Sequence, residues 1–90
     1  MANRRGLKPG RHLPPVAAEP LIRVSADLQQ LDAQLRESGF APAATVRPYL
    51  RCDRRLTLQF VWRRRQGGWS CTHTTTLRVP VDHELGRMAL

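Results

Sequence analysis

Cysteine and long apolar runs are both scarce in this chain, and each shortage excludes a class of protein. Two cysteines in 90 residues are too few for the disulfide scaffold of a small secreted protein. No apolar run approaches the ~20 residues that a membrane-spanning helix needs. The first ten residues, MANRRGLKPG, contain no apolar segment typical of a secretory signal. We therefore expect a cytoplasmic protein with reduced thiols and no membrane contact.

Acidic residues and lysine are scarce as well. Seven Asp and Glu stand against fifteen Lys and Arg, which gives a net charge of +8, and Lys8 is the single lysine. The codon usage of a GC-rich genome would explain the preference for arginine over lysine, but it would not explain the net charge. A chain this basic is attracted to phosphate backbones, anionic membranes or acidic proteins.

Residues 1–20 combine four prolines and two glycines with a strong positive charge. This composition cannot bury a core, so we expect a basic, Pro-rich, flexible arm that precedes one small α+β domain over residues 21–90. The simpler interpretation of this segment is a flexible terminus without a function. The functional interpretation is an arm that becomes ordered when it binds a partner. Its basic residues are Arg4, Arg5, Lys8 and Arg11.

The spacing of leucines predicts a helix from about Ala26 to Ser38. Leu28, Leu31 and Leu35 recur on one stripe, and polar residues fill the opposite face. Ser25 is a suitable N-cap, and Gly39 can adopt the left-handed conformation that ends a helix. The apolar residues just before Ser25 suggest either a short strand or an apolar segment that packs on the core ahead of the helix.

After this helix the period of the hydrophobic pattern changes from 3.6 residues to 2 residues, which predicts β-strands. Two alternating segments, from Arg55 to Arg65 and from Ser70 to Val79, flank Gly67-Gly68, a strong signal for a two-residue hairpin turn. Such a turn pairs residues whose numbers sum to 135. Apolar side chains then meet mostly apolar ones: Leu56 with Val79, Leu58 with Leu77, Phe60 with Thr75 and Trp62 with His73.

A further strand is expected over about 45–52, ahead of a three-residue loop. That loop places Leu50 opposite Leu56 and Val46 opposite Phe60. Pro48 indicates an edge strand, because it lacks a backbone N–H. The predicted fold is α+β: one helix packed on a three-stranded antiparallel meander, in the order α-β-β-β. A short strand before the helix and a short helix on Leu85, Met88 and Leu90 are weaker expectations.

The sheet face turned away from the helix is expected to collect arginine and threonine. Guanidinium groups match phosphate oxygens in geometry, and hydroxyls add neutral hydrogen bonds. A solvated sheet face would also be polar, so the pattern alone leaves both interpretations open. With one outward aromatic residue, phosphate or duplex-shape contact fits better than base stacking. The candidate residues on the strands are Arg47, Tyr49, Arg51, Arg55, Arg63 and Arg78.

The predicted hairpin ends in a second cluster of basic residues. Arg63, Arg64 and Arg65 precede the turn, and Trp69 follows it. Tryptophan flanked by arginine has the composition of an interface hot spot. Packing beside Trp62, to close the hydrophobic layer, is the alternative role for Trp69.

The sequence carries little evidence for metal binding or catalysis. Cys52, Cys71, His73 and His83 match no standard zinc spacing, and the register places the two cysteines at opposite ends of the sheet. His73 is expected to face inward against Trp62. No acid pair or oriented nucleophile is evident, so we expect no catalytic residues, no metal site and no cofactor.

The predicted α-β-β-β-α order is similar in topology to the double-stranded-RNA-binding fold, which some small toxin ribonucleases also use. The basic Gly/Ser/Lys start of the second helix that is typical of that family is missing. The Gly-Ser-His of the toxins has no counterpart near Arg55-Leu56-Thr57. The similarity of topology alone carries no function.

Three functional hypotheses follow, in order of preference. The first is a non-enzymatic protein that binds nucleic acid, DNA or RNA, through the arginine-rich face and the arm. The second is a protein-binding inhibitor or adaptor, of the kind that phages or mobile elements encode, which docks on an acidic surface of a host complex. The third is a toxin-like ribonuclease. The core is small for independent folding, so a homodimer is also plausible.

Overall fold

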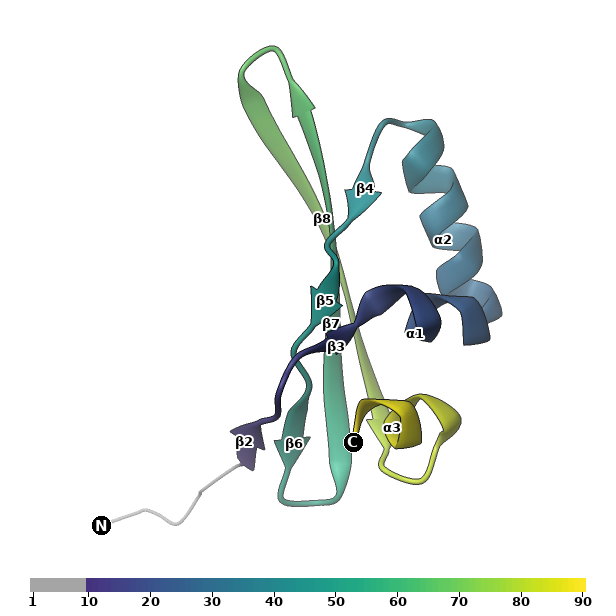
Figure 1. Ribbon diagram of the computed structural model, residues 1–90, viewed down its shortest axis with the longest axis vertical. Helices are drawn as coiled ribbons and strands as arrows, with labels where there is room; N and C mark the ends of the chain where they lie inside the picture. Colours follow the sequence, from purple (N-terminus) through teal and green to yellow (C-terminus); the bar gives the residue numbers. More distant parts are fainter. Residues whose placement is uncertain (1–9) are drawn as a thin grey trace, which may run out of the picture.

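The computed structural model describes residues 10–90 and shows an α+β protein with antiparallel sheets (Figure 1). The α+β class is confirmed, but there are more strands than the predicted meander has. The helices are α1 (Ala18–Val24), α2 (Ala26–Glu37) and α3 (Glu84–Ala89). The strands are β2 (Gly10–His12), β3 (Val16–Ala17), β4 (Ala41–Pro42), β5 (Thr45–Val46), β6 (Tyr49–Arg51), β7 (Arg55–Gln66) and β8 (Trp69–Pro80).

The hairpin of β7 and β8 is the largest element of the molecule. The two strands pair over their whole lengths, from Gln66 opposite Trp69 to Arg55 opposite Pro80, in the predicted register. Gly67 and Gly68 have φ values of 56° and 86°, which a two-residue turn of the favoured twist requires and which glycine adopts without strain. Turn chemistry and side-chain alternation therefore select the same pairing.

The other edge of β7 is shared by two short strands. β6 pairs with its first half, with Leu50 opposite Leu56 as predicted, and β4 pairs with Trp62 and Arg63 further along. The expected pairing of Val46 with Phe60 is wrong, because β5 pairs with β3 and places Val46 opposite Val16. Pro48 has no N–H to donate, and it interrupts the segment that the sequence predicted as one strand. Val46 remains buried.

Residues 10–20, which the sequence assigned to the arm, form β2, β3 and the start of α1. The prediction that the Pro48-containing strand lies at a sheet edge is also wrong, since β2 covers β6 (Figure 1). Gly10 permits this close pairing, because a Cβ there would collide with the carbonyl oxygen of Leu50. Further along, the Leu13 N–H donates to the Pro48 carbonyl at 2.8 Å.

The long helix begins and ends as its sequence indicates. Ser25 Oγ accepts from the Leu28 N–H at 3.2 Å. At the other end Gly39 has a φ of 88°, and the Phe40 N–H donates to the Leu35 carbonyl at 2.9 Å, which completes a Schellman motif. The segment before Ser25 forms the helix α1 rather than a short strand.

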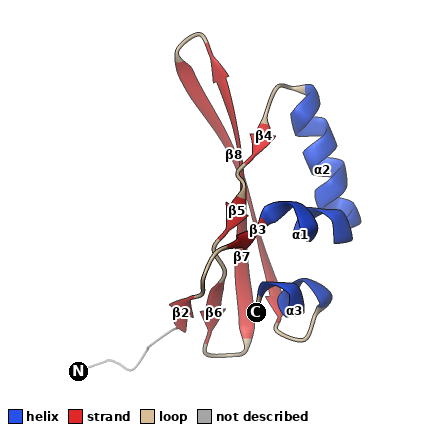
Figure 2. Cartoon of the chain, viewed as in Figure 1, coloured by secondary structure: helices blue, strands red, loops and turns tan. Residues whose placement is uncertain are grey.

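The core lies between the helices and one face of β7. Every second side chain of β7 from Leu56 to Trp62 is at most 2% exposed, and α1 adds Leu21 and Ile22. The helices lie to one side of the hairpin (Figure 2), so the opposite face of the sheet is left uncovered. The expected C-terminal helix is present as α3, which buries Leu85.

One polar contact ties α2 to β7. The Trp62 side chain is fully buried, and its indole Nε1–H donates to Asp32 Oδ1 at 2.9 Å. The other carboxylate oxygen of Asp32 accepts from Arg36 at 2.9 Å. An indole N–H in a core needs an acceptor, so Asp32 stabilises the packing of α2 against β7.

Asp32→Ala should lower the free energy of unfolding by about 1–3 kcal/mol, because it leaves the buried indole N–H unpaired. Asp32→Asn keeps an acceptor and should cost less. Glu37→Ala, on the exposed surface of the same helix, is the control and should change stability by less than about 0.5 kcal/mol. Urea denaturation measures all three, and equal losses for Asp32→Ala and Glu37→Ala would contradict this role.

Candidate functional site

Alternation along the hairpin places arginines on the uncovered face of the sheet. Odd-numbered residues of β7 and even-numbered residues of β8 share this face, because the register pairs odd with even throughout. We call it the outer face. Its exposed arginines on these strands and on β6 are Arg51, Arg55, Arg63, Arg65 and Arg78, and Thr72, Thr74 and Thr76 lie among them.

The outer face has little negative charge to balance these arginines. Asp53, in the loop before β7, accepts from Arg51 Nε at 3.3 Å and from the Arg55 backbone N–H at 3.2 Å. Within residues 10–90, Arg55, Arg63, Arg65 and Arg78 form no ion pair. Their guanidinium groups are therefore available to an external anion.

Two further candidates lie near the β2 end of the sheet. Tyr49 is opposite Thr57, so it points to the outer face, where it is half-buried. Its ring meets that of His12 edge to face, with centroids 5.0 Å apart. Arg47 is exposed in the segment between β5 and β6. Sequence reasoning did not include His12, because it gave residues 1–20 no fixed structure.

Arg64 is placed differently from Arg63 and Arg65. It lies on the helix-facing side of β7, where its Nη1 donates to the Ser38 carbonyl at 2.9 Å. Its guanidinium lies over the Phe40 ring, 4.7 Å from the centroid. Arg64 Nε is buried and has no hydrogen-bond partner among the described residues. This side chain fastens the end of α2 to the hairpin.

Trp69 is 78% exposed at the tip of the hairpin, which extends beyond β4 and α2 (Figure 1). It therefore does not pack beside Trp62 in the core. Its position in β8 puts it on the helix-facing side, opposite to the face of Arg63 and Arg65. The tip cluster that the sequence groups together is thus divided between two faces.

The basic arm is only partly described. Arg4, Arg5 and Lys8 lie outside residues 10–90, and Arg11 lies in β2, where it is exposed opposite Leu50. The structure therefore places one arm residue at the edge of the sheet.

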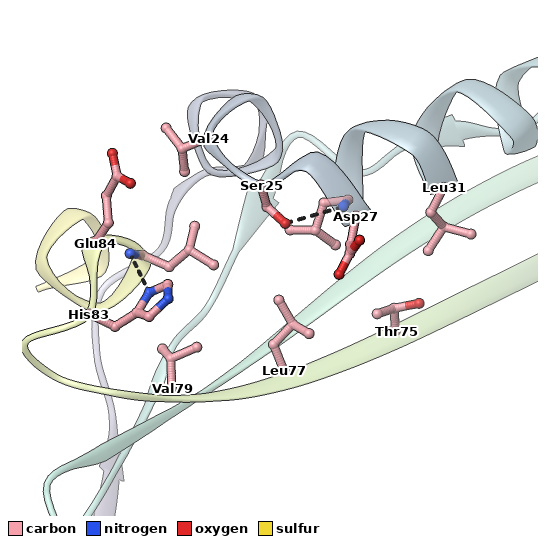
Figure 3. A pocket seen from close by; sticks show the side chains of 11 residues that line it. Val24, Ser25, Asp27, Leu31, Thr75, Leu77, Val79, His83 and Glu84 are labelled. Carbon is pink, nitrogen blue, oxygen red and sulfur yellow. Dashed lines mark hydrogen bonds between the residues drawn. The ribbon is translucent and has the colours of Figure 1, made fainter.

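A groove of about 430 Å³ separates β8 from the three helices, and sequence reasoning did not anticipate it (Figure 3). Its floor is apolar and its rim carries two carboxylates. The groove forms because the helices cover β7 more fully than β8, so that inward side chains of β8 stay partly open. The residues that line it include Val24, Asp27, Leu31, Leu77, Val79 and Glu84.

The residues considered for metal binding do not gather. Among residues 10–90 no three His, Cys, Asp or Glu side chains come close enough to hold a metal ion. Cys52 is exposed and Cys71 is half-buried, and both are free thiols. His73 packs edge to face on Trp62, with centroids 6.1 Å apart, but it is exposed because no helix covers that part of β8.

No protein-family model, curated protein or solved structure matches the chain. None of the helices formed by residues 10–90 has the length and apolar character needed to span a membrane.

Arg64→Ala should lower the free energy of unfolding by about 1–2 kcal/mol, because it removes a hydrogen bond to the end of α2 and the packing on Phe40. Arg63→Ala, the adjacent outer-face change, should have an effect below about 0.5 kcal/mol. Thermal unfolding followed by circular dichroism compares the two. Equal effects would mean that Arg64 is an ordinary surface residue.

Proposed function

We propose that the protein is a non-enzymatic nucleic-acid-binding protein that contacts phosphates through the outer face. The observation that supports this most directly is an uncovered sheet face with unpaired arginines on adjacent strands and a single nearby carboxylate. Arginine and threonine side chains at the regular spacing of a β-sheet suit contacts to phosphate oxygens. Such contacts position a protein on nucleic acid without reading its sequence.

The length of the face supports a duplex as the ligand. Arg55 and Arg65 lie ten positions apart on β7, which corresponds to roughly 33 Å at the rise of an extended strand. One turn of duplex DNA spans about 34 Å. Arginines at the two ends of the strand can thus reach phosphates one turn apart, with Arg63 and Arg78 contacting phosphates between them.

The low aromatic content of the outer face argues against single-stranded nucleic acid as the ligand. Sequence-independent binding of single strands uses several aromatic rings on which bases stack. Tyr49 and His12 are the rings on the described outer face, and they pack on each other. Phosphate contact with a duplex therefore fits better than base stacking.

Binding of labelled duplex DNA, measured by fluorescence anisotropy, should weaken linearly on a plot of log affinity against log salt. Replacing Arg55, Arg63, Arg65 and Arg78 together with Gln should reduce the slope by about 0.9 for each phosphate that the variant no longer neutralises. Duplex RNA and single-stranded RNA, titrated in parallel, identify the preferred polymer.

Arg23→Gln is the matched control, because it makes the same change in charge on the helix side of the molecule. It should leave the salt slope nearly unchanged. A slope that falls equally for Arg23→Gln and for Arg63→Gln would show that binding follows total charge and not the outer face.

The second hypothesis, an inhibitor or adaptor that docks on an acidic protein, has one observation in its favour, namely the exposure of Trp69. An exposed aromatic residue of this size is a typical anchor at interfaces. In this case Trp69→Ala should abolish capture of the partner, whereas the four outer-face substitutions should only slow association. Trp69→Ala should leave DNA affinity unchanged if the first hypothesis holds.

A further inference from the structure

β8 has an open edge. It pairs with β7 along all 12 residues, and within residues 10–90 no strand pairs with its other side. Exposed edges of this length are templates for pairing with another chain, and proteins usually block them with lysine, proline or a bulge. Here Pro80 stands at the very end, and the only charged side chain on the strand is Arg78.

The turn determines which backbone groups point outward. A two-residue turn makes Gln66 and Trp69 a hydrogen-bonded pair, and such pairs recur at every second position of an antiparallel ladder. The odd-numbered residues of β8 therefore bond to β7, and the even-numbered ones direct their N–H and C=O groups to the open edge. These residues are Ser70, Thr72, Thr74, Thr76 and Arg78.

This set of residues is symmetric about Thr74. We propose that β8 pairs antiparallel with β8 of a second copy of the chain, with Thr74 on the two-fold axis. Residues whose numbers sum to 148 then lie opposite each other, and every outward N–H and C=O from Ser70 to Arg78 gains a partner. A shift of two residues would leave some of these groups unpaired or bring Pro80, which has no N–H, into the ladder.

The same register explains why Trp69 is exposed. It places Trp69 directly opposite the partner's Val79, on the helix-facing side of both strands. Val79 and Leu77 line the apolar groove, so the indole of one copy enters the groove of the other. Burying an aromatic side chain of this size removes about 150–250 Å² of surface from water. The two-fold symmetry repeats this contact at both ends of the interface.

The charges of the two copies are compatible with this arrangement. Arg78 falls opposite the partner's Ser70, so no like charges meet across the axis. Asp27 and Glu84 on the groove rim form no ion pair among the described residues. The basic hairpin tip of each copy therefore comes near the two carboxylates on the groove rim of the other. A net charge of +8 per chain still opposes association at low salt.

The dimer does not rest on the proposed function, because backbone hydrogen bonds of the β8 edge and the Trp69 contact hold it together, and not the outer-face guanidinium groups. It would place two outer faces side by side in one continuous sheet. Loss of the dimer and loss of nucleic-acid binding are therefore separable by experiment.

Light scattering after gel filtration, in about 0.3 M salt to screen repulsion, should give a dimer of the full chain that dissociates on dilution. Thr74→Pro removes an N–H that only the partner uses, and proline is tolerated at a strand edge. It should give a folded monomer, whereas Thr74→Ala, which keeps the N–H, should remain dimeric. Trp69→Ala should raise the dissociation constant at least about tenfold.

A disulfide tests the register. Cys71 lies opposite the partner's Leu77 in a pair without mutual hydrogen bonds, where Cα atoms are about 4.5 Å apart and a disulfide can form. In a Cys52→Ser background, Leu77→Cys should give a covalent dimer with oxidised glutathione. Thr75→Cys is the control, since its diagonal separation from the partner's Cys71 is about 7–8 Å.

The proposal would be overturned if the wild-type chain stays monomeric at every soluble concentration. This holds even if the monomer binds a different protein through this edge. A dimer that survives Thr74→Pro would overturn it as well. Cross-linking of Thr75→Cys as efficiently as Leu77→Cys would refute the register. Circular dichroism confirms for each variant that the monomer remains folded.

Discussion

The pairing of β7 with β8 is the constraint that determines most of this structure. Gly67 and Gly68 fix the register, and the register fixes which side chains of both strands face the helices. Leu56, Leu58 and Trp62 are then buried, and the residues between them form the exposed basic face. A slip of one residue would exchange the two faces, so one turn determines both the core and the candidate site.

The elements that the sequence predicts well are those with a local signal. The caps at Ser25 and Gly39 are backbone chemistry within a few residues of the helix they delimit. The hairpin register follows from a turn type and from alternation. The short strands β2, β3 and β4 have no such signal, because each exists only by pairing with a distant segment and contains proline or glycine neighbours that favour loops. Tertiary pairing overrides composition there.

The candidate site was predictable to a similar degree. Alternation placed Arg55, Arg63 and Arg78 on one face, and the structure agrees with that placement. It was not predictable that Arg64 would bond to the end of α2, because that contact depends on where Phe40 and Ser38 lie relative to the hairpin. The groove beside β8 was not predictable either, since it arises from incomplete helix coverage rather than from any residue pattern.

Separate groups are proposed to carry the two interactions: the outer-face arginines would contact phosphate, and the open edge and groove would contact a second copy. The arginines and Trp69 therefore do not form one interface, although they adjoin in sequence. This separation comes from strand alternation, which turns neighbouring residues to opposite sides of the sheet.

Phosphate binding by the outer face can be tested by an NMR titration of the isotope-labelled protein with duplex DNA, which follows backbone and arginine side-chain signals. We expect the largest shifts on the outer face, at Arg55, Arg63, Arg65 and Arg78, with small changes in α1 and α2. Shifts concentrated on the groove and the helices, with the outer-face arginines unmoved, would contradict the proposed function.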